Sequence, residues 1–425
     1  MRFVSGPRAA LPVADEMSTP IVLFGRAASR DVASAGASAA ATIRRRALLP
    51  DPAAWDLLAI ALSVVVADGA TKRAKSPDGW TREIRLDVAL HDSKRWDLFA
   101  DSLSSALAFL TTDRWQVAFR DGGVLPDAPK KPRRPDTDAI VLLSGGLDSL
   151  IGAIDLSAEG RRLFAVSQTV RGDADKQRRF AGIIGGGLEY ISVNHNASTR
   201  RGLKETSQRS RSLIFLAFAV LAATATERYH DGDTIPLYVC ENGFIAINPP
   251  LTYARIGSLS TRTAHPEFLA RMQDILDGVG LRVMITNPYA EKTKGDMLRA
   301  CLDQTLLGAE AAVSTSCGRF QRFNYTHCGR CLPCQIRRAA FVAWGREDLT
   351  KYVYTDLGRS DEDHAAFDDV RSVAMARLVV AEDGLDRWLG PTLGSPRITN
   401  KAALRAMLQR GVDELGRLHA KYGLA

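Results

Sequence analysis

The residues from Ser144 to Ser149 have the types and spacing to bind phosphate. They read Ser-Gly-Gly-Leu-Asp-Ser and follow four apolar residues, 140–143, that are typical of a buried parallel strand. The apolar periodic segment from Leu150 onward predicts a helix. A strand, a glycine turn and a helix N-terminus let backbone amides and the helix dipole face an anion. Ser144 and Ser149 add hydroxyl donors, and Asp148 could hold Mg²⁺ or order the loop. A turn with a serine N-cap and no ligand is the alternative interpretation.

Four of the six cysteines form a second group with ligand chemistry. Cys317 is followed by Cys328, Cys331 and Cys334, so the last three stand at C-x-x-C spacing. In a cytosolic enzyme such a cluster indicates a metal rather than disulfides. Four thiolates suit tetrahedral zinc, and a complete sulfur set leaves no position for water, so the zinc would be structural. Replacement of one ligand by His327, an iron–sulfur cluster and free thiols are the alternatives.

Alternating strands and helices must position these two groups. Strands are predicted at 162–167, 190–193, 236–241 and 283–285, and helices at 207–225, at 268–276 and from about 292. This alternation predicts an α/β fold, a doubly wound parallel sheet that binds ligands at the carboxyl ends of its strands. Cys240 and Cys301 are expected to be ordinary core residues.

The polar segment 248–268 is long, with several glycines and prolines, and such loops often carry function. Arg255 and Arg262 could clamp a carboxylate or phosphate through bidentate hydrogen bonds. Surface arginines without a ligand are the alternative for both.

Four segments are expected along the chain. The basic, proline-spaced residues 129–137 predict an extended, exposed linker. They separate an N-terminal α+β extension, 1–128, from the phosphate-loop domain, 138–345. Within the extension, residues 1–50 are expected to be partly ordered with one short strand. Residues 346–425 predict a mostly helical C-terminal extension.

Length and composition limit the class of protein. The 425 residues exceed the usual size of one domain, and 46% hydrophobic with 24% charged residues is ordinary for a globular protein. The net charge of +8 suits anionic ligands, but it supports nucleic-acid binding only weakly. The longest apolar stretches, 57–67 and 213–225, are too short to span a bilayer, and the N-terminus lacks the apolar core of a signal peptide. A cytoplasmic location without membrane contact is therefore expected.

The loop and the cysteines together resemble one known family. No Gly-Lys pair and no G-x-G-x-x-G after a strand occur, so the commonest nucleotide loops are excluded. Ser144–Ser149 resembles the pyrophosphate loop (PP-loop) of the N-type ATP pyrophosphatases, which cleave ATP between its α and β phosphates. With the cysteine set and its flanking residues, the chain is similar to the 7-cyano-7-deazaguanine synthase (QueC) family over residues 138–345. The matching segments between the two motifs are Ile214–Leu216, Pro266–Phe268 and Thr293–Met297.

The chain departs from the family pattern in three respects. The gap after Cys317 is longer than usual, Thr263-Ala264-His265 replaces the substrate-loop residues, and both ends are extended. This layout resembles the QueC-like (QatC) components of the bacterial Qat antiphage defence systems. The resemblance implies protein partners from the same operon, namely a P-loop ATPase, a small protein and a TatD-like nuclease.

The family resemblance implies an ATP-dependent carbon–nitrogen ligase. It would adenylate 7-carboxy-7-deazaguanine or a similar carboxylate, and an amine from ammonia or a partner protein would displace AMP. ATP, Mg²⁺ and Zn²⁺ are the expected cofactors. The expected site residues are Ser144, Gly145, Gly146, Leu147, Asp148 and Ser149 for phosphate, Asp148 and Lys294 for catalysis, Arg255, Arg262 and His265 for substrate, and Cys317, Cys328, Cys331 and Cys334 for metal. A tRNA-modifying enzyme with the same loop and a non-catalytic nucleotide-binding assembly subunit are the alternatives.

Overall fold

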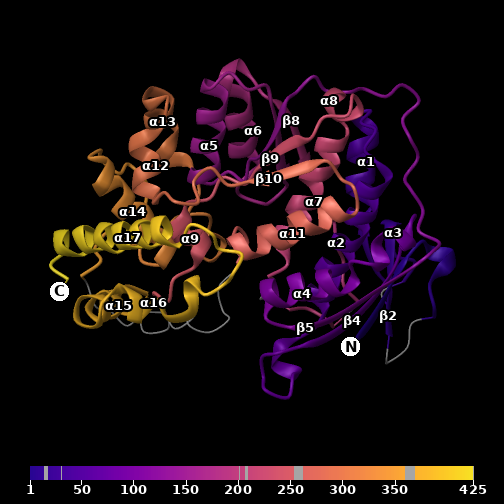
Figure 1. The fold of residues 1–425 in the computed structure, drawn as a ribbon, viewed down its shortest axis with the longest axis horizontal. Coiled ribbons are helices and arrows are strands. Elements are labelled where there is room, and N and C mark those ends of the chain that lie inside the picture. The colour runs from indigo at the N-terminus through magenta and orange to yellow at the C-terminus, as the bar shows by residue number, and fades with distance from the viewer. Residues whose placement is uncertain are drawn as a thin grey trace.

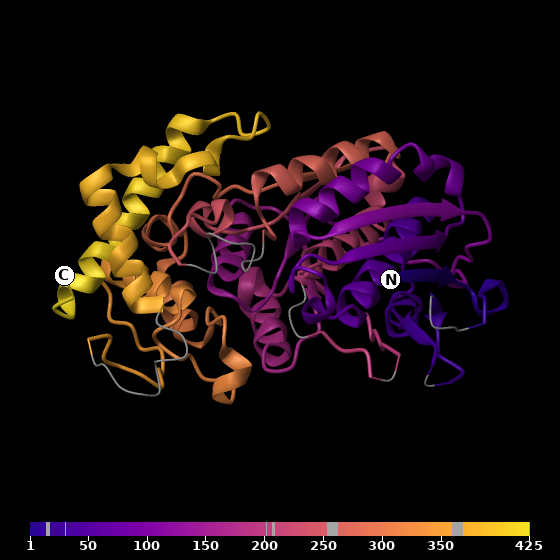
Figure 2. The same cartoon turned by 90° about the horizontal axis from the view of Figure 1, so that it is seen from below.

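Two five-stranded parallel sheets organise the chain, as the computed structural model shows (Figures 1 and 2). The structure describes residues 1–13, 18–29, 31–200, 202–205, 209–252, 262–358 and 369–424. All strand pairs within the two sheets are parallel. The predicted α/β fold class is therefore confirmed.

The first sheet belongs to the N-terminal part of the chain and has the strand order β3-β2-β1-β4-β5. Its strands are β1 (Arg2–Gly6), β2 (Ser18–Gly25), β3 (Ala33–Gly36), β4 (Glu83–Ala89) and β5 (Arg114–Arg120). Its helices are α1 (Ala37–Arg45), α2 (Pro52–Ala70), α3 (Ser93–Asp97) and α4 (Ala100–Thr111). Buried and exposed residues alternate along β4 and β5, which is typical of a sheet with one covered face.

The second sheet holds the phosphate-loop sequence and has the order β10-β9-β6-β7-β8. Its strands are β6 (Ala139–Leu142), β7 (Leu163–Gln168), β8 (Glu189–Val193), β9 (Ile235–Tyr238) and β10 (Val283–Thr286). Its helices are α5 (Leu147–Ala158), α6 (Ala174–Ile183), α7 (Arg211–Thr224), α8 (Glu227–His230), α9 (Gly243–Ile247), α11 (Pro266–Gly278), α12 (Lys294–Ala300), α13 (Gln304–Glu310) and α14 (Leu332–Trp344).

The two sheets share one hydrophobic core. Helix α2 packs on the first sheet, α7 packs on the second, and the two helices contact each other between the sheets (Figure 1). In β6, Ile140 and Leu142 face this shared core, whereas Ala139 and Val141 face α5, α12 and α14. A strand covered on both faces is continuously apolar, as the sequence pattern predicts.

Helix α2 shows why the shared core forms. Asp51 caps it, because its carboxylate accepts the amide of Ala53 at 2.8 Å, and Pro52 suits the first turn. Every later residue of α2 is buried. By length and composition α2 could cross a membrane. Its apolar stretch is entirely buried inside the fold, however, as in the core helix of a globular protein.

The C-terminal helices form a third cluster at the end of the molecule opposite the first sheet (Figures 1 and 2). They are α15 (Asp369–Asp383), α16 (Leu385–Leu389) and α17 (Lys401–Lys421). Helix α17 packs on α14 and α9, and thus on the phosphate-loop unit.

The N-terminal part differs from the expectation in one respect. Residues 1–50, predicted to contain one short strand, contain β1, β2, β3 and α1. The expected α+β extension is thus a parallel sheet with alternating helices. Strands β1 and β3 were missed because they are only five and four residues long, and β1 also depends on β4, about eighty residues away, as a partner. The segment boundaries stay a prediction.

Candidate functional site

The predicted phosphate loop lies between β6 and α5, as expected. Gly145 has φ +86°, a conformation that favours glycine. The Ser149 hydroxyl accepts the Ser144 amide at 3.2 Å and lies 3.0 Å from the carbonyl oxygen of Gly146. No side chain among the described residues caps α5, so the amides at its start can face an anion. The loop has the geometry of a phosphate cradle.

The segment around Thr315, which is distant in sequence, contacts the phosphate loop. The Thr315 amide donates to the Gly145 carbonyl oxygen at 2.9 Å, and the Thr315 hydroxyl donates to Asp173 at 2.7 Å. Lys176 on α6 bonds to the same hydroxyl and to Asp173. Burial lowers the pKa of Lys176, and the Asp173 carboxylate opposes that shift. This cation beside the loop was missed in the sequence, where it was one charge among several in a helix.

A cavity of about 320 Å³ opens beside the loop, at the carboxyl ends of β6, β7 and β9. Loop residues Ser144, Gly146 and Ser149 form one wall, and the first turns of α7 form another. The lining residues outside the loop are mainly Gln168, Asp173, Gln177, Arg211, Ser212, Phe215, Cys240, Glu241 and Thr315. Ligands bind at this edge of parallel sheets, so the cavity is the candidate nucleotide site.

Cys240 was expected in the core, and it forms part of the cavity wall. Burial raises the pKa of its thiol, so at neutral pH it stays protonated. A neutral thiol is a poor nucleophile, which gives no support to sulfur chemistry at this position.

Asp148 and Lys294, predicted as catalytic residues, are brought together below the loop rather than in the cavity. The two side chains form a buried ion pair. The second Asp148 oxygen accepts the Asn242 side-chain amide at 2.7 Å. Burial raises the pKa of Asp148, but Lys294, Glu241 and Asn242 outweigh it and lower that pKa to about 2. The pair thus joins α5 to α12 and, through Asn242, to the start of α9.

The three predicted substrate residues are not gathered at the cavity. Arg255 lies outside the described residues. Arg262 donates to the Phe109 carbonyl oxygen at 3.1 Å, and the His265 ring packs against the Phe109 ring. His265 also accepts the Glu267 amide as the N-cap of α11, and burial lowers its pKa to about 4. Both side chains therefore bond to other parts of the fold, and their neighbours Thr263 and Ala264 line the cavity.

The four predicted metal ligands lie together, with all four sulfur atoms within 4.8 Å of one another. The Cys317 and Cys331 sulfurs are 3.8 Å apart, and those of Cys328 and Cys334 are 3.9 Å apart. A tetrahedron with Zn–S bonds of about 2.3 Å has edges of about 3.8 Å. All four residues are buried, so the cluster could hold zinc.

His327, the alternative ligand, serves the backbone instead. Its Nε2 accepts the Ser316 amide at 3.1 Å, and its ring packs between Phe320 and Tyr352. Burial lowers its pKa to about 3, so the ring is neutral at ordinary pH. It orients the segment that leads into Cys317.

The cysteine cluster and the phosphate loop are connected. Arg337 on α14 is fully buried and donates to the hydroxyls of Ser314 and Ser316 at 3.0 and 3.1 Å. Thr315, between them, bonds to Gly145. A metal in the cluster would therefore fix the 314–316 segment, which supports the loop.

Comparison with known proteins shows which proteins the chain is similar to. The family model described as queuosine biosynthesis protein QueC matches residues 263–345. The 7-cyano-7-deazaguanine synthase of Ectopseudomonas mendocina (strain ymp) is 26% identical over 240 residues, 51% of this chain and 99% of that protein. The synthase of Novosphingobium aromaticivorans (strain ATCC 700278 / DSM 12444 / CCUG 56034 / CIP 105152 / NBRC 16084 / F199) is 28% identical over 257 residues, 53% of this chain and 96% of that protein. Half of the chain is thus similar to nearly complete 7-cyano-7-deazaguanine synthases.

Proposed function

We propose that the chain is an ATP-dependent enzyme that adenylates the carboxylate of a 7-deazaguanine-type acid and transfers the acyl group to an amine. The main support is the uncapped start of α5, which faces a cavity beside a serine-lined loop. The synthases that resemble the chain are named for a 7-deazaguanine product. AMP and pyrophosphate would be the other products.

The chemistry follows from the poor reactivity of a carboxylate toward amines. A carboxylate oxygen attacks the α phosphorus of ATP, and the bond from that phosphorus to the bridging oxygen breaks to release pyrophosphate. The amine then attacks the acyl carbon, AMP leaves with the bonding electrons, and the amine loses a proton. The loop amides and the hydroxyls of Ser144 and Ser149 would hold the leaving pyrophosphate.

Mg²⁺ would neutralise charge on the ATP phosphates. The carboxylates of Asp173 and Glu241 line the cavity, and Mg²⁺ is commonly bound by one or two carboxylates together with phosphates and water. We propose these two as its protein contacts, because both side chains line the cavity, whereas Asp148 does not. Asp148 and Lys294 would then position the loop and α12.

The cysteine cluster would hold zinc as a structural metal. Its four thiolates occupy a complete tetrahedral set, so the metal would fold the 317–334 segment and support Thr315. An iron–sulfur cluster in its place would give visible absorbance, which a zinc protein lacks.

We further propose that the enzyme acts in the cytoplasm as part of a bacterial antiphage system and that the acceptor amine belongs to a partner protein. The alignments with the synthases cover about half of the chain, and the regions outside them support this proposal. The altered substrate loop, with Thr263 and Ala264 at the cavity, provides a second reason. Gene neighbourhood tests this assignment directly.

Release of AMP and pyrophosphate from ATP, with Mg²⁺ and 7-carboxy-7-deazaguanine, tests the activity. AMP formation should require the acid and fall about a hundredfold in Ser149→Ala, because that hydroxyl organises the loop. Ser102→Ala, at an exposed position on α4, is the control. Mass spectrometry of co-purified proteins would identify a modified acceptor. Absence of AMP release in a folded, zinc-loaded sample would contradict the proposal.

A further inference from the structure

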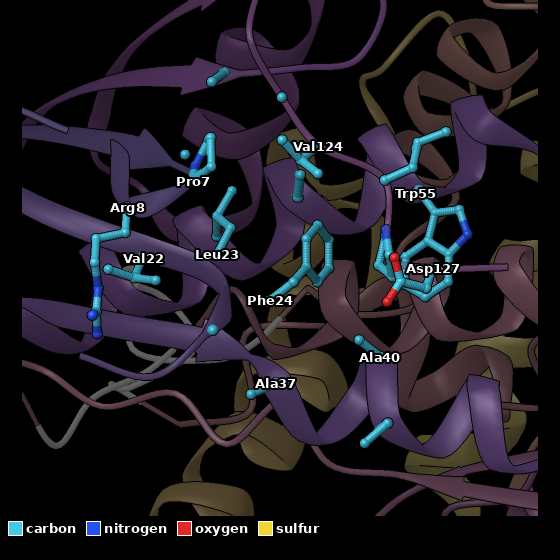
Figure 3. A pocket seen from close by; sticks show the side chains of 18 of the residues that line it. Pro7, Arg8, Val22, Leu23, Phe24, Ala37, Ala40, Trp55, Val124 and Asp127 are labelled. Atoms are coloured by element: carbon cyan, nitrogen blue, oxygen red, sulfur yellow. The ribbon is translucent and has the colours of Figure 1, made fainter. Parts of the chain in front are cut away.

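The first sheet contains a second cavity, of about 420 Å³, at the carboxyl ends of β1, β2 and β4 (Figure 3). In the order β3-β2-β1-β4-β5, the chain continues from β1 to β2 and β3 on one side of β1. Strands β4 and β5 lie on the other side of β1. Parallel sheets bind ligands at this switch point, outside the strand ends. Gly6 and Ala89 mark it: a Cβ on Gly6 would come 2.9 Å from the Cβ of Ala89.

The walls of this cavity are aromatic and aliphatic. The Phe24 and Trp55 rings meet edge to face with centroids 5.5 Å apart, and both line the cavity with Leu23 and Val124 (Figure 3). Phe24 has φ +56° where the β2–β3 register shifts. Such a conformation is uncommon for a bulky residue, and strained positions and bulges gather at binding sites.

The cavity also carries positive charge. Arg8, Arg26 and Arg44 line it, and all three are exposed enough to move toward a ligand. The start of α1 lies at the same cavity, and helix N-termini favour anions. Of the two lining carboxylates, Asp56 is buried and accepts the amides of His91 and Asp92 at 2.7 and 3.1 Å. The other, Asp127, is exposed.

We propose that this cavity binds a nucleoside monophosphate, with its base against Phe24 and Trp55 and its phosphate on Arg8, Arg26 and Arg44. Guanidinium groups match phosphate oxygens in bidentate pairs. The volume lies near the lower end of the range for small-molecule sites, about 300–1,000 Å³, which suits one nucleotide rather than a dinucleotide. The site is separate from the phosphate loop, and its occupancy does not depend on the activity proposed above.

The test uses guanosine monophosphate with the full-length protein. Binding is measured by titration calorimetry, and hydrogen–deuterium exchange locates the site. Binding should be saturable, and it should slow exchange in 37–45 and 121–128. Guanosine and inorganic phosphate, each with half of the proposed contacts, should bind at least tenfold more weakly.

Arg44→Glu and Arg45→Glu form a matched pair on α1. Arg44 lines the cavity, whereas Arg45 bonds to its own helix at Ala41 and Thr42 and does not. Arg44→Glu should weaken guanosine monophosphate at least tenfold, and Arg45→Glu less than twofold. ATP-dependent pyrophosphate release should stay unchanged in both.

Three outcomes would overturn the proposal. They are no saturable binding at millimolar concentration, protection confined to residues 144–158, and equal affinity in the two glutamate variants. Melting temperatures of both variants within a few degrees of the wild type would establish that each is folded.

Discussion

Each of the two sheets has five parallel strands and a cavity at the carboxyl ends of those strands. The sheets differ in the turn that follows the central strand. In the second sheet, β6 leads through Ser144–Gly146 directly into α5, so backbone amides face the cavity. In the first, β1 leads into a short 3-10 turn at Arg8–Ala10, and the positive charge comes from arginines. Each sheet thus provides a location for a ligand, and under the proposed function the strand-to-helix turn of the second sheet would bind the phosphates.

The support behind the two cavities differs as well. The loop of the second sheet is joined to the cysteine cluster through Thr315 and to α12 through the Asp148–Lys294 pair. No such metal cluster lies at the first cavity in the part of the chain that the structure describes. Metal loss should therefore affect one cavity and spare the other.

Replacement of a cluster cysteine should have the largest effect. Cys331→Ser should abolish metal binding, unfold the 317–334 segment and reduce AMP release to background, since structural zinc contributes folding free energy directly. We expect a loss of well over 3 kcal/mol in the free energy of unfolding. Metal content by mass spectrometry and thermal melts would measure both effects.

Cys301→Ser is the control for this change, because Cys301 is buried but lies outside the cluster. It should keep full metal content. Binding of guanosine monophosphate at the first cavity should persist in Cys331→Ser. Normal metal content in Cys331→Ser would contradict the four-cysteine site.

Removal of one member of the Asp148–Lys294 pair should come next. Lys294→Met should cost about 3–5 kcal/mol, because it leaves a carboxylate buried without its cation. Asp148→Asn should cost a similar amount, and the double variant less than the sum of the two. Urea unfolding of the three variants would measure this coupling. Additive losses would show that the ion pair is not formed.

The same pair predicts a pH dependence. The pKa of Asp148 is about 2 in the folded protein and about 3.9 in an unfolded chain. The unfolded state therefore binds more protons between these values. The contribution of Asp148 is complete above about pH 4 and is lost as the pH falls through the folded value. The stability difference between wild type and Asp148→Asn should accordingly shrink below pH 4.

A third substitution, at Asp68, tests the contact between the two sheets. Asp68 on α2 pairs with Arg82 at 2.6 Å, and it accepts the amides of Arg209 and Ser210 at 2.8 and 2.9 Å. It thus joins the first sheet to the start of α7, whose first turns line the nucleotide cavity. Asp68→Ala should cost about 3 kcal/mol and raise KM for ATP. Asp101→Ala, at an exposed position, should change neither quantity.

The predictability of these features depends on how local they are. The β6–loop–α5 unit and the Cys328–Cys334 spacing are predictable because each lies within a short stretch of sequence. Strands β1 and β3 were not, because they are only five and four residues long, too short to show a clear alternation. The sequence likewise suggests that Asp148 and Lys294 act at the site. Their pairing across 146 positions appears only in the fold.

The substrate prediction failed to gain support for a similar reason. Arg262 and His265 look available in a polar loop, but Phe109, on α4 beside the first sheet, contacts both. Lys176 and Asp173 reach the loop through Thr315, which is more than 130 positions away. A nonlocal contact decides in each case whether a polar side chain is structural or faces the ligand.

The smallest expected effect concerns the C-terminal helices, which have no counterpart beside the first cavity among the described residues. Glu414 on α17 is buried and accepts the Thr293 hydroxyl at 2.6 Å, next to Lys294. Burial raises the pKa of Glu414, so the folded state binds its proton more tightly than the unfolded state. The contribution of Glu414 to the free energy of unfolding should therefore increase as the pH falls through the folded and unfolded pKa values of this residue. It should be lower at neutral pH.

Two substitutions separate the hydrogen bond of Glu414 from its charge. Glu414→Gln keeps an acceptor for Thr293 without the buried charge, so stability at pH 7.5 should equal or slightly exceed that of the wild type. Glu414→Ala should lose about 1 kcal/mol, because the Thr293 hydroxyl loses its partner. Urea unfolding at pH 5 and pH 7.5 would measure both. A loss in Glu414→Gln as large as that in Glu414→Ala would show that the charge itself supports Lys294, and that the C-terminal extension contributes electrostatically to the phosphate-loop site.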